Sequence, residues 1–442
     1  MPCLGLPNEE EMMSQQSLLR SCILPHIVLV GALAFAIAPS GASAYTLTTL
    51  HSFCAWVNCG DGIVPSELLE DSSGDLYGTA EAGGKYGEGV VFKLLPNPKT
   101  GKYNQHVLHN FCKKTKCPDG KAPVGGLIMD VDGNLYGVTE QGGKSNAGVI
   151  FEMTPVQGGW SYKVLHFFCN QANCTDGALP TQGLSYLGQE SGILWDGKAP
   201  LFGTTSEGGV GTGYGNGIDY EITSAPLSLY MMIHTFTSGK APQRVLVTAS
   251  GSLFGTTVAG GKYNHGLLYR LTPSGGAWTD AVLHNFCADA QCADGANPFG
   301  RLAMDAAGNL FGATSNGGAN CNVDCGVIFE RPAGGGYQVT YSFCSLSACG
   351  DGEEPLTSPV IDSSGNLFGT TALGGPNGGG VVYKLAPGGT LSVLYGFCAG
   401  GSCMDGDGPI EPLLPDAHGD LFGSTFGGGA NGDFGTVFEL TP

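Results

Sequence analysis

The sequence predicts an all-β fold, a seven-bladed β-propeller of four-stranded blades, and three observations support this. The triplet Leu-Tyr-Gly or Leu-Phe-Gly, followed closely by Thr, recurs between 52 and 66 residues apart, beginning at Leu76, Leu135, Leu201, Leu253, Leu310, Leu367 and Leu421. The 442-residue chain contains 75 glycines and is nevertheless 42% hydrophobic, as many turns between short buried strands require. Beyond residue 44, no segment has a sustained apolar period of 3.6 residues, so helices should be few.

Each copy contains four short runs that are typical of β-strands. In the second copy they are "GGLIMD", "NLYGVT", "GVIFEMTP" and "WSYKVLHFF", and "DVDGN" forms the hairpin turn between the first two. The runs are rich in β-branched and aromatic residues and are bounded by Gly, Pro or Asn. Gly142 and Gly143 precede a strand instead of a helix, which favours a turn over a phosphate-binding loop. Four strands per repeat, seven times, indicate a propeller; the structural alternative is an open sheet solenoid.

The two ends of the repeat region favour the closed ring. The last copy has only three strand-like runs, at 411–415, 420–425 and 435–440. The segment "YTLTTLHSF", Tyr45–Phe53, matches the fourth strand of the second copy, "SYKVLHFF". We therefore expect the N-terminal strand to complete the last blade, which removes the exposed sheet edges that a solenoid would leave. Residues 45–442 should form a single propeller domain.

Residues 1–44 have the pattern of a signal peptide. Arg20 precedes an apolar run from Cys22 to Ala38, and "ASA" at Ala42–Ala44 fits a cleavage site. The alternative is an uncleaved membrane anchor. No later stretch approaches the roughly 18–20 apolar residues of a membrane span, and the chain ends at "FELTP" without an anchor sequence. We expect a secreted, extracellular protein with no membrane span in its mature part.

Fourteen of the sixteen cysteines lie outside that leader, in close pairs. In an exported chain such pairs predict disulfides, each stabilising the fold by about 2 kcal/mol. The alternative is structural zinc, which usually requires two pairs with shorter spacing brought together. The predicted disulfides are Cys54–Cys59, Cys112–Cys117, Cys169–Cys174, Cys287–Cys292, Cys321–Cys325, Cys344–Cys349 and Cys398–Cys403.

The charge balance excludes some classes of partner. The formal net charge is −19, from 38 acidic and 19 basic residues. Nucleic acids and anionic membranes need basic surfaces, so neither is expected as a partner. The balance suits solubility, cation binding or neutral ligands such as sugars. We expect a monomer.

The repeated motif G-N-L-[YF]-G-x-T…G-G-x(4,6)-G-V-[VI]-F-x-L resembles the GloVer tandem repeat of exported bacterial proteins, often called the choice-of-anchor family. The resemblance covers nearly all of Tyr45–Pro442. It implies export and a propeller-like repeat, and it implies no catalytic residues. The F-C-x(4)-C-x-D-G segment, here called the cassette, is a separate feature of this chain.

Strand order predicts where a ligand could bind. The loop between the second and third strands leaves a blade at the same end as the cassette, which leads to the next blade; we call this end the cassette face. A ring of cassette acids near the central channel could bind calcium, or a sugar by hydrogen bonds. The alternative is a turn in which Asp caps its own backbone. The candidate ligand-binding residues are Asp61, Asp119, Asp176, Asp294, Asp351 and Asp405.

Other polar residues also repeat or break the repeat. One position of the fourth strand is occupied by His51, His109, His166, His234, His284, Tyr341 and Tyr395. Such repetition predicts blade packing, with a catalytic base as the alternative. The third copy has an insertion at 188–200, and the link after it lacks the cysteines and Asp but contains Lys240 and Arg244. A ligand that contacts one sector of the ring could use these breaks.

The sequence favours a non-catalytic exported scaffold that binds a glycan or protein. The alternative is an extracellular polysaccharide lyase or hydrolase with an acidic or metal-binding site on the cassette face. The fold alone cannot decide between these functions, since propellers host both. No cofactor is predicted, apart from the calcium considered above.

Overall fold

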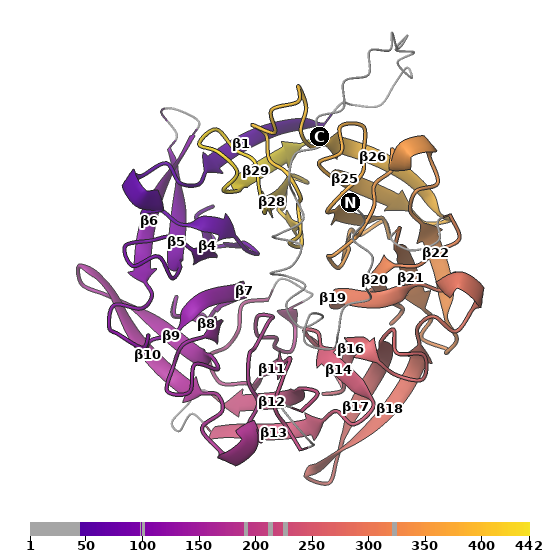
Figure 1. Cartoon of the computed structure of the whole chain (residues 1–442), viewed down its shortest axis with the longest axis horizontal. Coiled ribbons are helices and arrows are strands. Elements are labelled where there is room, and N and C mark those ends of the chain that lie inside the picture. The colour runs from indigo at the N-terminus through magenta and orange to yellow at the C-terminus, as the bar shows by residue number, and fades with distance from the viewer. Residues whose placement is uncertain are drawn as a thin grey trace, which may run out of the picture. The chain divides into compact units, whose positions relative to one another are not determined.

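The computed structural model describes residues 45–97, 99, 102–189, 193–210, 215–223, 229–320 and 325–442. The predicted signal peptide and Cys321 lie outside the described residues. The part of the chain from Tyr45 onward forms seven antiparallel sheets arranged in a ring (Figure 1), so the predicted seven-bladed propeller is confirmed. The described residues contain no α-helix; their helical turns are the 3-10 turns η2 (Val57–Cys59), η3 (Ala172–Cys174), η5 (Ala290–Cys292) and η6 (Ser347–Cys349).

The blades are numbered in chain order, and each is given from its innermost strand outward. Blade 1 contains β2 (Ile63–Pro65) with β3 (Leu69–Glu70), then β4 (Leu76–Ala82), β5 (Val90–Asn97) and β6 (Lys102–Asn110). Blade 2 contains β7 (Lys121–Met129), β8 (Leu135–Gln141), β9 (Val149–Val156) and β10 (Gly159–Phe167). Blade 3 contains β11 (Leu201–Thr205), β12 (Ile218–Thr223) and β13 (Leu229–Thr235). Blade 4 contains β14 (Gly239–Pro242) with β15 (Leu246–Val247), then β16 (Leu253–Gly260), β17 (Leu267–Ser274) and β18 (Ala277–Asn285); blade 5 contains β19 (Ala296–Met304), β20 (Leu310–Asn316), β21 (Val327–Arg331) and β22 (Gln338–Ser342). Blade 6 contains β23 (Val360–Ile361), β24 (Leu367–Thr371), β25 (Val381–Ala386) and β26 (Thr390–Gly396); blade 7 contains β27 (Leu414–Pro415), β28 (Leu421–Thr425), β29 (Thr436–Thr441) and β1 (Thr46–Ser52).

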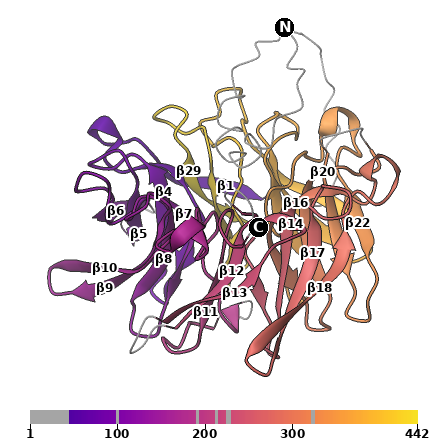
Figure 2. The same cartoon turned by 60° about the horizontal axis from the view of Figure 1, so that its bottom comes forward.

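The innermost strands vary in length, since β7 and β19 span nine residues each whereas β23 and β27 span two. In blade 3, two isolated bridges, Ala178–Glu207 and Ser185–Phe202, take the place of an innermost strand. Chain bends after the inner-strand proline interrupt the ladder in several other blades. Figure 2 shows the β9–β10 hairpin projecting at the left of the view and the β17–β18 hairpin projecting at the bottom. The cassettes leave the opposite ends of these strands, as the predicted face assignment requires.

The N-terminal strand closes the ring as predicted. β1 pairs antiparallel with the C-terminal β29, from Thr46 opposite Thr441 to Ser52 opposite Thr436. The edge of β29 is therefore covered by a strand from the other end of the chain.

A backbone contact between neighbouring blades recurs seven times. The residue before each inner-strand proline has φ between 50° and 61°, and six of the seven are not glycine: Val64, Ala122, Leu179, Ala241, Asn297 and Glu354, with Gly408 as the seventh. Each donates its N–H to a loop carbonyl of the preceding blade, for example Leu179 to Ala147 at 3.0 Å. The next loop residue is always glycine, since a Cβ there would lie 2.4–3.0 Å from the proline Cδ. The strained backbone is thus offset by a bond that joins two blades.

Replacing one of these glycines should therefore be costly. A Cβ on Gly148 would lie 2.3 Å from the Thr139 carbonyl oxygen and 2.8 Å from Pro180 Cδ. We expect Gly148→Ala to lower the free energy of unfolding by about 3 kcal/mol, measured by urea denaturation. Gly133→Ala is the matched control, because Gly133 also has positive φ but a Cβ there would meet no other atom within 4 Å. It should cost about 1 kcal/mol; equal losses would contradict the close-contact explanation.

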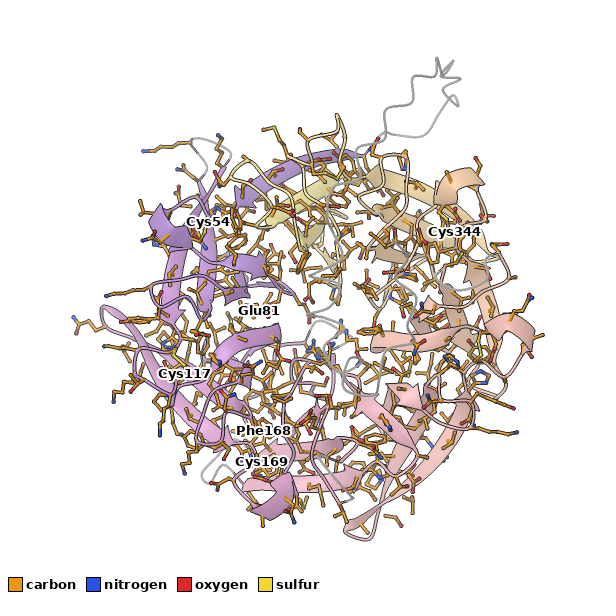
Figure 3. All side chains as sticks on the ribbon, viewed as in Figure 1. Cys54, Glu81, Cys117, Phe168, Cys169 and Cys344 are labelled. Carbon is orange, nitrogen blue, oxygen red and sulfur yellow. A yellow bond between two sulfur atoms is a disulfide. The ribbon has the colours of Figure 1, made fainter. Side chains whose placement is uncertain are left out.

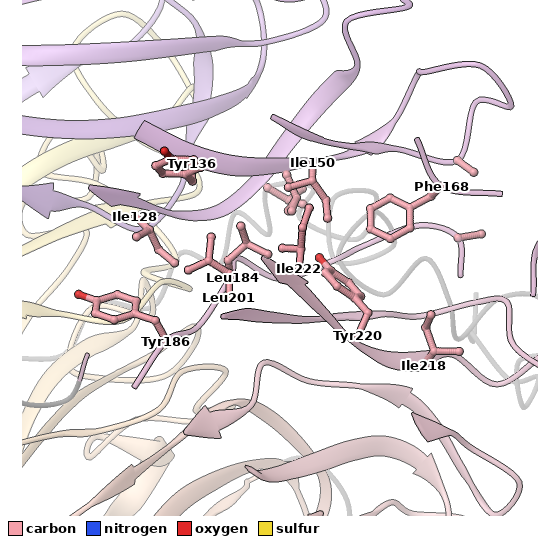
Figure 4. Packing of buried hydrophobic residues seen from close by; sticks show 14 of the residues in the cluster. Ile128, Tyr136, Ile150, Phe168, Leu184, Tyr186, Leu201, Ile218, Tyr220 and Ile222 are labelled. Carbon is pink, nitrogen blue, oxygen red and sulfur yellow. The ribbon is translucent and has the colours of Figure 1, made fainter. Parts of the chain in front are cut away.

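The hydrophobic core lies between neighbouring sheets. Figure 4 shows one such cluster, in which Ile128 of blade 2 lies near Leu184, and Phe168 lies near Tyr220 of blade 3 with ring centroids 5.3 Å apart. The insertion of the third copy contributes Trp195, which is 1% exposed and packs edge-on against Tyr136 with ring centroids 4.8 Å apart. The insertion therefore adds the Trp195 side chain to the core between blades 2 and 3, whereas the neighbouring Ile193 and Leu194 are 62% and 41% exposed.

Candidate functional site

The cassettes are closed loops between successive blades. Six of the seven predicted disulfides are formed: Cys54–Cys59, Cys112–Cys117, Cys169–Cys174, Cys287–Cys292, Cys344–Cys349 and Cys398–Cys403. The seventh involves Cys321, outside the described residues. Figure 3 shows Cys54, Cys117, Cys169 and Cys344 in the outer half of the ring, and Glu81 near its centre.

Most cassette aspartates bind the backbone of their own loop. Asp61 accepts hydrogen bonds from the N–H groups of Ala55, at 2.9 Å, and Trp56, at 3.2 Å. The same two bonds are made by Asp176, Asp294 and Asp351, and one of them by Asp405. This geometry is that of the turn alternative. Burial raises the pKa of Asp61, but the hydrogen bonds from His51 and these amides outweigh it and hold the pKa below its usual range.

The cassette aspartates also contact the outermost strand of the preceding blade. His51, His109 and His284 approach Asp61, Asp119 and Asp294 through Nε2 at 3.1, 3.3 and 2.9 Å. The hydroxyls of Tyr341 and Tyr395 donate to Asp351 and Asp405 at 2.7 Å. A bulge beside each of these positions re-aims the side chain. The six aspartates therefore lie between outer strands, not around the central channel where the sequence analysis placed them.

The histidines pack against the next blade, which supports the packing interpretation. His166 stacks on Tyr230 and His284 on Tyr337, each with ring centroids 3.7 Å apart. The Tyr230 hydroxyl donates to the backbone carbonyl of Asp176 at 2.7 Å. The sequence analysis missed these tyrosines, although each stands four residues before the repeated His or Tyr position of its own strand. Where that repeated position holds Tyr341 or Tyr395, the next blade has leucine instead, at 391 and 47.

Burial of His166 should make the fold sensitive to acid. Burial lowers the pKa of His166 from 6.5 to about 4, and the charge of Asp176 only partly opposes it. Between these pH values the unfolded chain binds the proton and the folded one does not, so the free energy of unfolding should fall by about 2 kcal/mol as the pH drops from 6.5 to 4. His166→Gln should flatten this dependence in urea titrations at several pH values, whereas exposed His106→Gln should not. An unchanged slope in His166→Gln would contradict the assignment.

The cassettes bring together, among the described residues, no set of free ligand atoms that suits structural zinc. Among the described residues, four groups bring His, Cys or carboxylate ligand atoms within 4.8 Å of one another, and every group contains both cysteines of a disulfide. Disulfide sulfurs are not thiolate ligands, so each group offers a single free ligand, where structural zinc needs four. None of the six cassette aspartates belongs to such a group.

The junction of blades 3 and 4 replaces the missing cassette with a buried polar pair. Asp219 is fully buried at a position where the other six copies have Val, Ile or Leu. Burial raises its pKa to about 8, against a hydrogen bond from the Tyr269 hydroxyl at 2.8 Å that lowers it. His234, on the neighbouring strand, has its pKa lowered by burial. The hydrogen bond between Asp219 of blade 3 and Tyr269 of blade 4 thus joins the two blades at the junction that has no disulfide loop.

A second group of polar residues lies on the innermost segments. Arg244 is 2% exposed; its Nη1 lies 2.6 Å from Glu67 Oε2 and its Nε lies 3.1 Å from Ser185 Oγ. Blades 1, 3 and 4 are thereby joined across the centre of the ring. The sequence analysis noted Arg244 as a break in the repeat but missed Glu67, which stands two residues after the inner-strand proline in its own copy, as Arg244 does.

Glu411 of blade 7 belongs to the same group. Burial, followed by the negative charges of Glu67 and Glu81, raises the pKa of Glu411 to about 8, and Arg244 only partly opposes this. The carboxyl of Glu411, with its raised pKa, therefore interacts with the Glu67 carboxyl that is paired with arginine. A strongly raised carboxyl pKa is typical of functional sites, and it also occurs in structural ion-pair networks.

The loops of the cassette face expose aromatic rings. Trp56 in the first cassette is 46% exposed, and Tyr86 and Tyr263, in the loops between the second and third strands of blades 1 and 4, are 37% and 38% exposed. Lys85 and Lys262 lie 5.7 and 5.0 Å from the centroids of these two tyrosine rings. Exposed rings of this kind, one of them on a loop closed by a disulfide, offer surfaces on which a planar or sugar-like ligand can stack.

Comparisons with known proteins agree with this architecture. A family model described as the Gloeobacter/Verrucomicrobia repeat matches residues 33–195, 189–400 and 324–442. A search of curated protein sequences found no match. Among the described residues, no helix is both long and apolar enough for a membrane crossing.

Solved structures similar to this one were found at low sequence identity. A catalytically inactive histidine-to-alanine variant of virginiamycin B lyase from Staphylococcus aureus, solved with quinupristin, is 12% identical with a TM-score of 0.53, over 90% of this chain and 99% of that one. A Bacteroides uniformis protein classed by inference as a 6-phosphogluconolactonase is 13% identical with a TM-score of 0.44, over 76% of this chain and 84% of that one. At such identities the likeness to the lyase concerns the fold alone.

Proposed function

We propose that this chain, which belongs to the Gloeobacter/Verrucomicrobia repeat family, is an exported, non-catalytic propeller that binds a glycan or protein through its cassette face. The observation that carries the proposal is the rigid presentation of exposed aromatic rings. Trp56 lies within a loop closed by a disulfide and by two bonds to Asp61. Because the loop is already ordered, little conformational entropy is lost on binding.

Rigidity extends from the cassette to the neighbouring loop. The N–H of Gly84 donates to the Cys59 carbonyl at 2.9 Å, so the loop that contains Tyr86 is joined to the cassette that contains Trp56. Two aromatic side chains are thus held on adjoining loops of one blade. Such an arrangement suits stacking against sugar rings, with the surrounding carbonyl and amide groups available as hydrogen-bond partners.

The proposal is tested by binding to a glycan array, with and without a chelator. We expect a defined set of glycans to be retained and not degraded, and Trp56→Ala and Tyr86→Ala to weaken retention by about tenfold each. Val131→Ala is the matched control, since Val131 is 63% exposed on the opposite face. Release of products from a bound polysaccharide, or equal binding by all variants, would overturn the proposal. Loss of binding in the presence of the chelator would indicate that the binding site contains calcium.

A polysaccharide lyase or hydrolase is the second candidate, and the carboxyl pair at the centre of the ring favours it. Protonated Glu411 could act as the acid and Glu67, oriented by Arg244, as the base. Incubation with a panel of polysaccharides should then give new reducing ends or unsaturated products, and Glu411→Gln should abolish them while the protein stays folded. Absence of products over the whole panel would leave the scaffold as the function.

A further inference from the structure

Five lysines gather in one sector of the cassette face of an otherwise acidic protein. Three lie in the second cassette, and the others in the loops between the second and third strands of blades 1 and 2; all five are exposed: Lys85, Lys113, Lys114, Lys116 and Lys144. We propose that this sector, here called the lysine sector, binds an anionic polysaccharide whose sugars carry carboxylate or sulfate groups. The inference rests on the proposed function and specifies its ligand class.

Backbone hydrogen bonds hold the three loops side by side. The N–H of Gly143 donates to the Cys117 carbonyl at 2.8 Å, which joins the loop of blade 2 to the cassette. The N–H of Ala122, just after the cassette, donates to the Glu88 carbonyl at 3.0 Å, which joins it to the loop of blade 1. The lysines thus belong to one continuous surface, although they are up to 59 positions apart in the sequence.

The charge of the sector is not explained by the fold. The other five disulfide cassettes contain no Lys or Arg, yet form the same disulfide. Lys116 adopts φ of 69°, where two other cassettes have Asn58 and Asn173, which tolerate this conformation better. Like charges this close also repel one another. Residues that are unfavourable for the local backbone or charge balance, and that do not stabilise the fold, are expected at functional sites.

The aspartate of this cassette also differs in its contacts. Asp119 makes no hydrogen bond to a cassette amide within the described residues, and its buried Oδ1 atom has no hydrogen-bond partner there. The backbone itself follows the common turn, since the N–H of Cys117 donates to the Lys114 carbonyl at 3.0 Å, as that of Cys59 does to the Trp56 carbonyl at 2.9 Å. The lysines are therefore not needed to form this turn.

The chemistry of the sector favours a polymer over a flat anionic surface. Five of the nineteen basic residues of the chain lie in these three loops, which contain only two acidic residues, Glu88 and Asp119. The sector therefore has an excess of positive charge, which acts over about one Debye length. Elsewhere the cassette face exposes acids such as Asp289 and Asp433. A flat membrane would meet these acids too, whereas a polymer strand can follow one sector. Tyr86, beside Lys85, offers a ring for stacking against a sugar.

Alginate, dextran sulfate and neutral dextran serve as probes, measured by affinity electrophoresis or calorimetry at several salt concentrations. We expect the intact protein to bind the two anionic polymers and not dextran, with affinity that falls as salt rises. The triple variant Lys113→Gln, Lys114→Gln, Lys116→Gln should weaken this binding by at least about tenfold. The control triple variant Lys99→Gln, Lys163→Gln, Lys198→Gln removes the same charge elsewhere and should change it by less than about twofold.

The outcomes separate this inference from the proposed function. Retention of neutral glycans on the array without any binding of alginate or dextran sulfate would overturn the inference and leave the proposed function standing. Absence of all glycan binding would overturn both the inference and the glycan-binding form of the proposed function. Equal losses in the two triple variants, or binding of anionic lipid vesicles that depends on the same three lysines, would also overturn the inference.

Discussion

A chain that lacks residues 45–52 should fail to form the closed ring. The deletion removes β1, and with it the six-residue register with β29 and the buried Leu50. It exposes one edge of blade 7 and opens two core clusters, because Leu47 and Leu50 pack in different ones. The lost ladder bonds and apolar contacts amount to on the order of 5–10 kcal/mol, comparable to the whole stability of a domain.

Light scattering and circular dichroism measure the outcome. The truncated protein should be aggregated or partly unfolded at temperatures where the intact ring is monomeric and cooperative. A synthetic peptide with the sequence "YTLTTLHSF", added in excess, should restore folding, and the same peptide with Leu50→Asp should not. A truncated protein that stays monomeric and as stable as the parent would show that β1 does not contribute to closure.

This closure illustrates what the sequence could predict. The fourth-strand pattern of residues 45–53 recurs at every fourth strand, so its partner β29 follows from counting strands. Repetition supplies the seven blades, the face of each loop and the disulfides, because each depends on residues close together in the chain. These features were predictable without knowing any distance in space.

The polar contacts between blades were not predictable in the same way. Arg244 and Glu67 are 177 positions apart and meet only because the ring brings blades 1 and 4 together at its centre. Tyr230, on the outermost strand of blade 3, lies 54 positions from Asp176, which stands in the cassette that leads into the same blade. The radial position of the aspartates was wrong for a related reason. Their loop leads from an outer to an inner strand, and the sequence does not reveal that the carboxylate remains at the outer end.

Arg244→Met should destabilise the protein by about 3–5 kcal/mol in urea denaturation at pH 7. The substitution keeps most of the side-chain volume but leaves the Glu67 carboxylate without its cation, close to Glu411 and Glu81. Removing one member of a buried ion pair costs more than the pair contributes, because the remaining charge is neither solvated nor matched. The exposed Lys198→Met is the control and should change stability by less than about 0.5 kcal/mol.

The double variant Arg244→Met, Glu67→Gln distinguishes the effect of an unpaired Glu67 carboxylate from the effect of lost packing around Arg244. If the unpaired carboxylate causes the instability, adding Glu67→Gln to Arg244→Met should restore at least half of the lost free energy of unfolding. Glu67→Gln alone should be destabilising, because it removes the negative charge that is paired with Arg244. Equal instability of the single and double variants would mean that Arg244 acts through its contacts with Ser185 and Leu184. The centre of the ring would then be held by hydrogen bonds from one residue, and the assignment of Glu67 and Glu411 as an acid–base pair would lose its electrostatic basis.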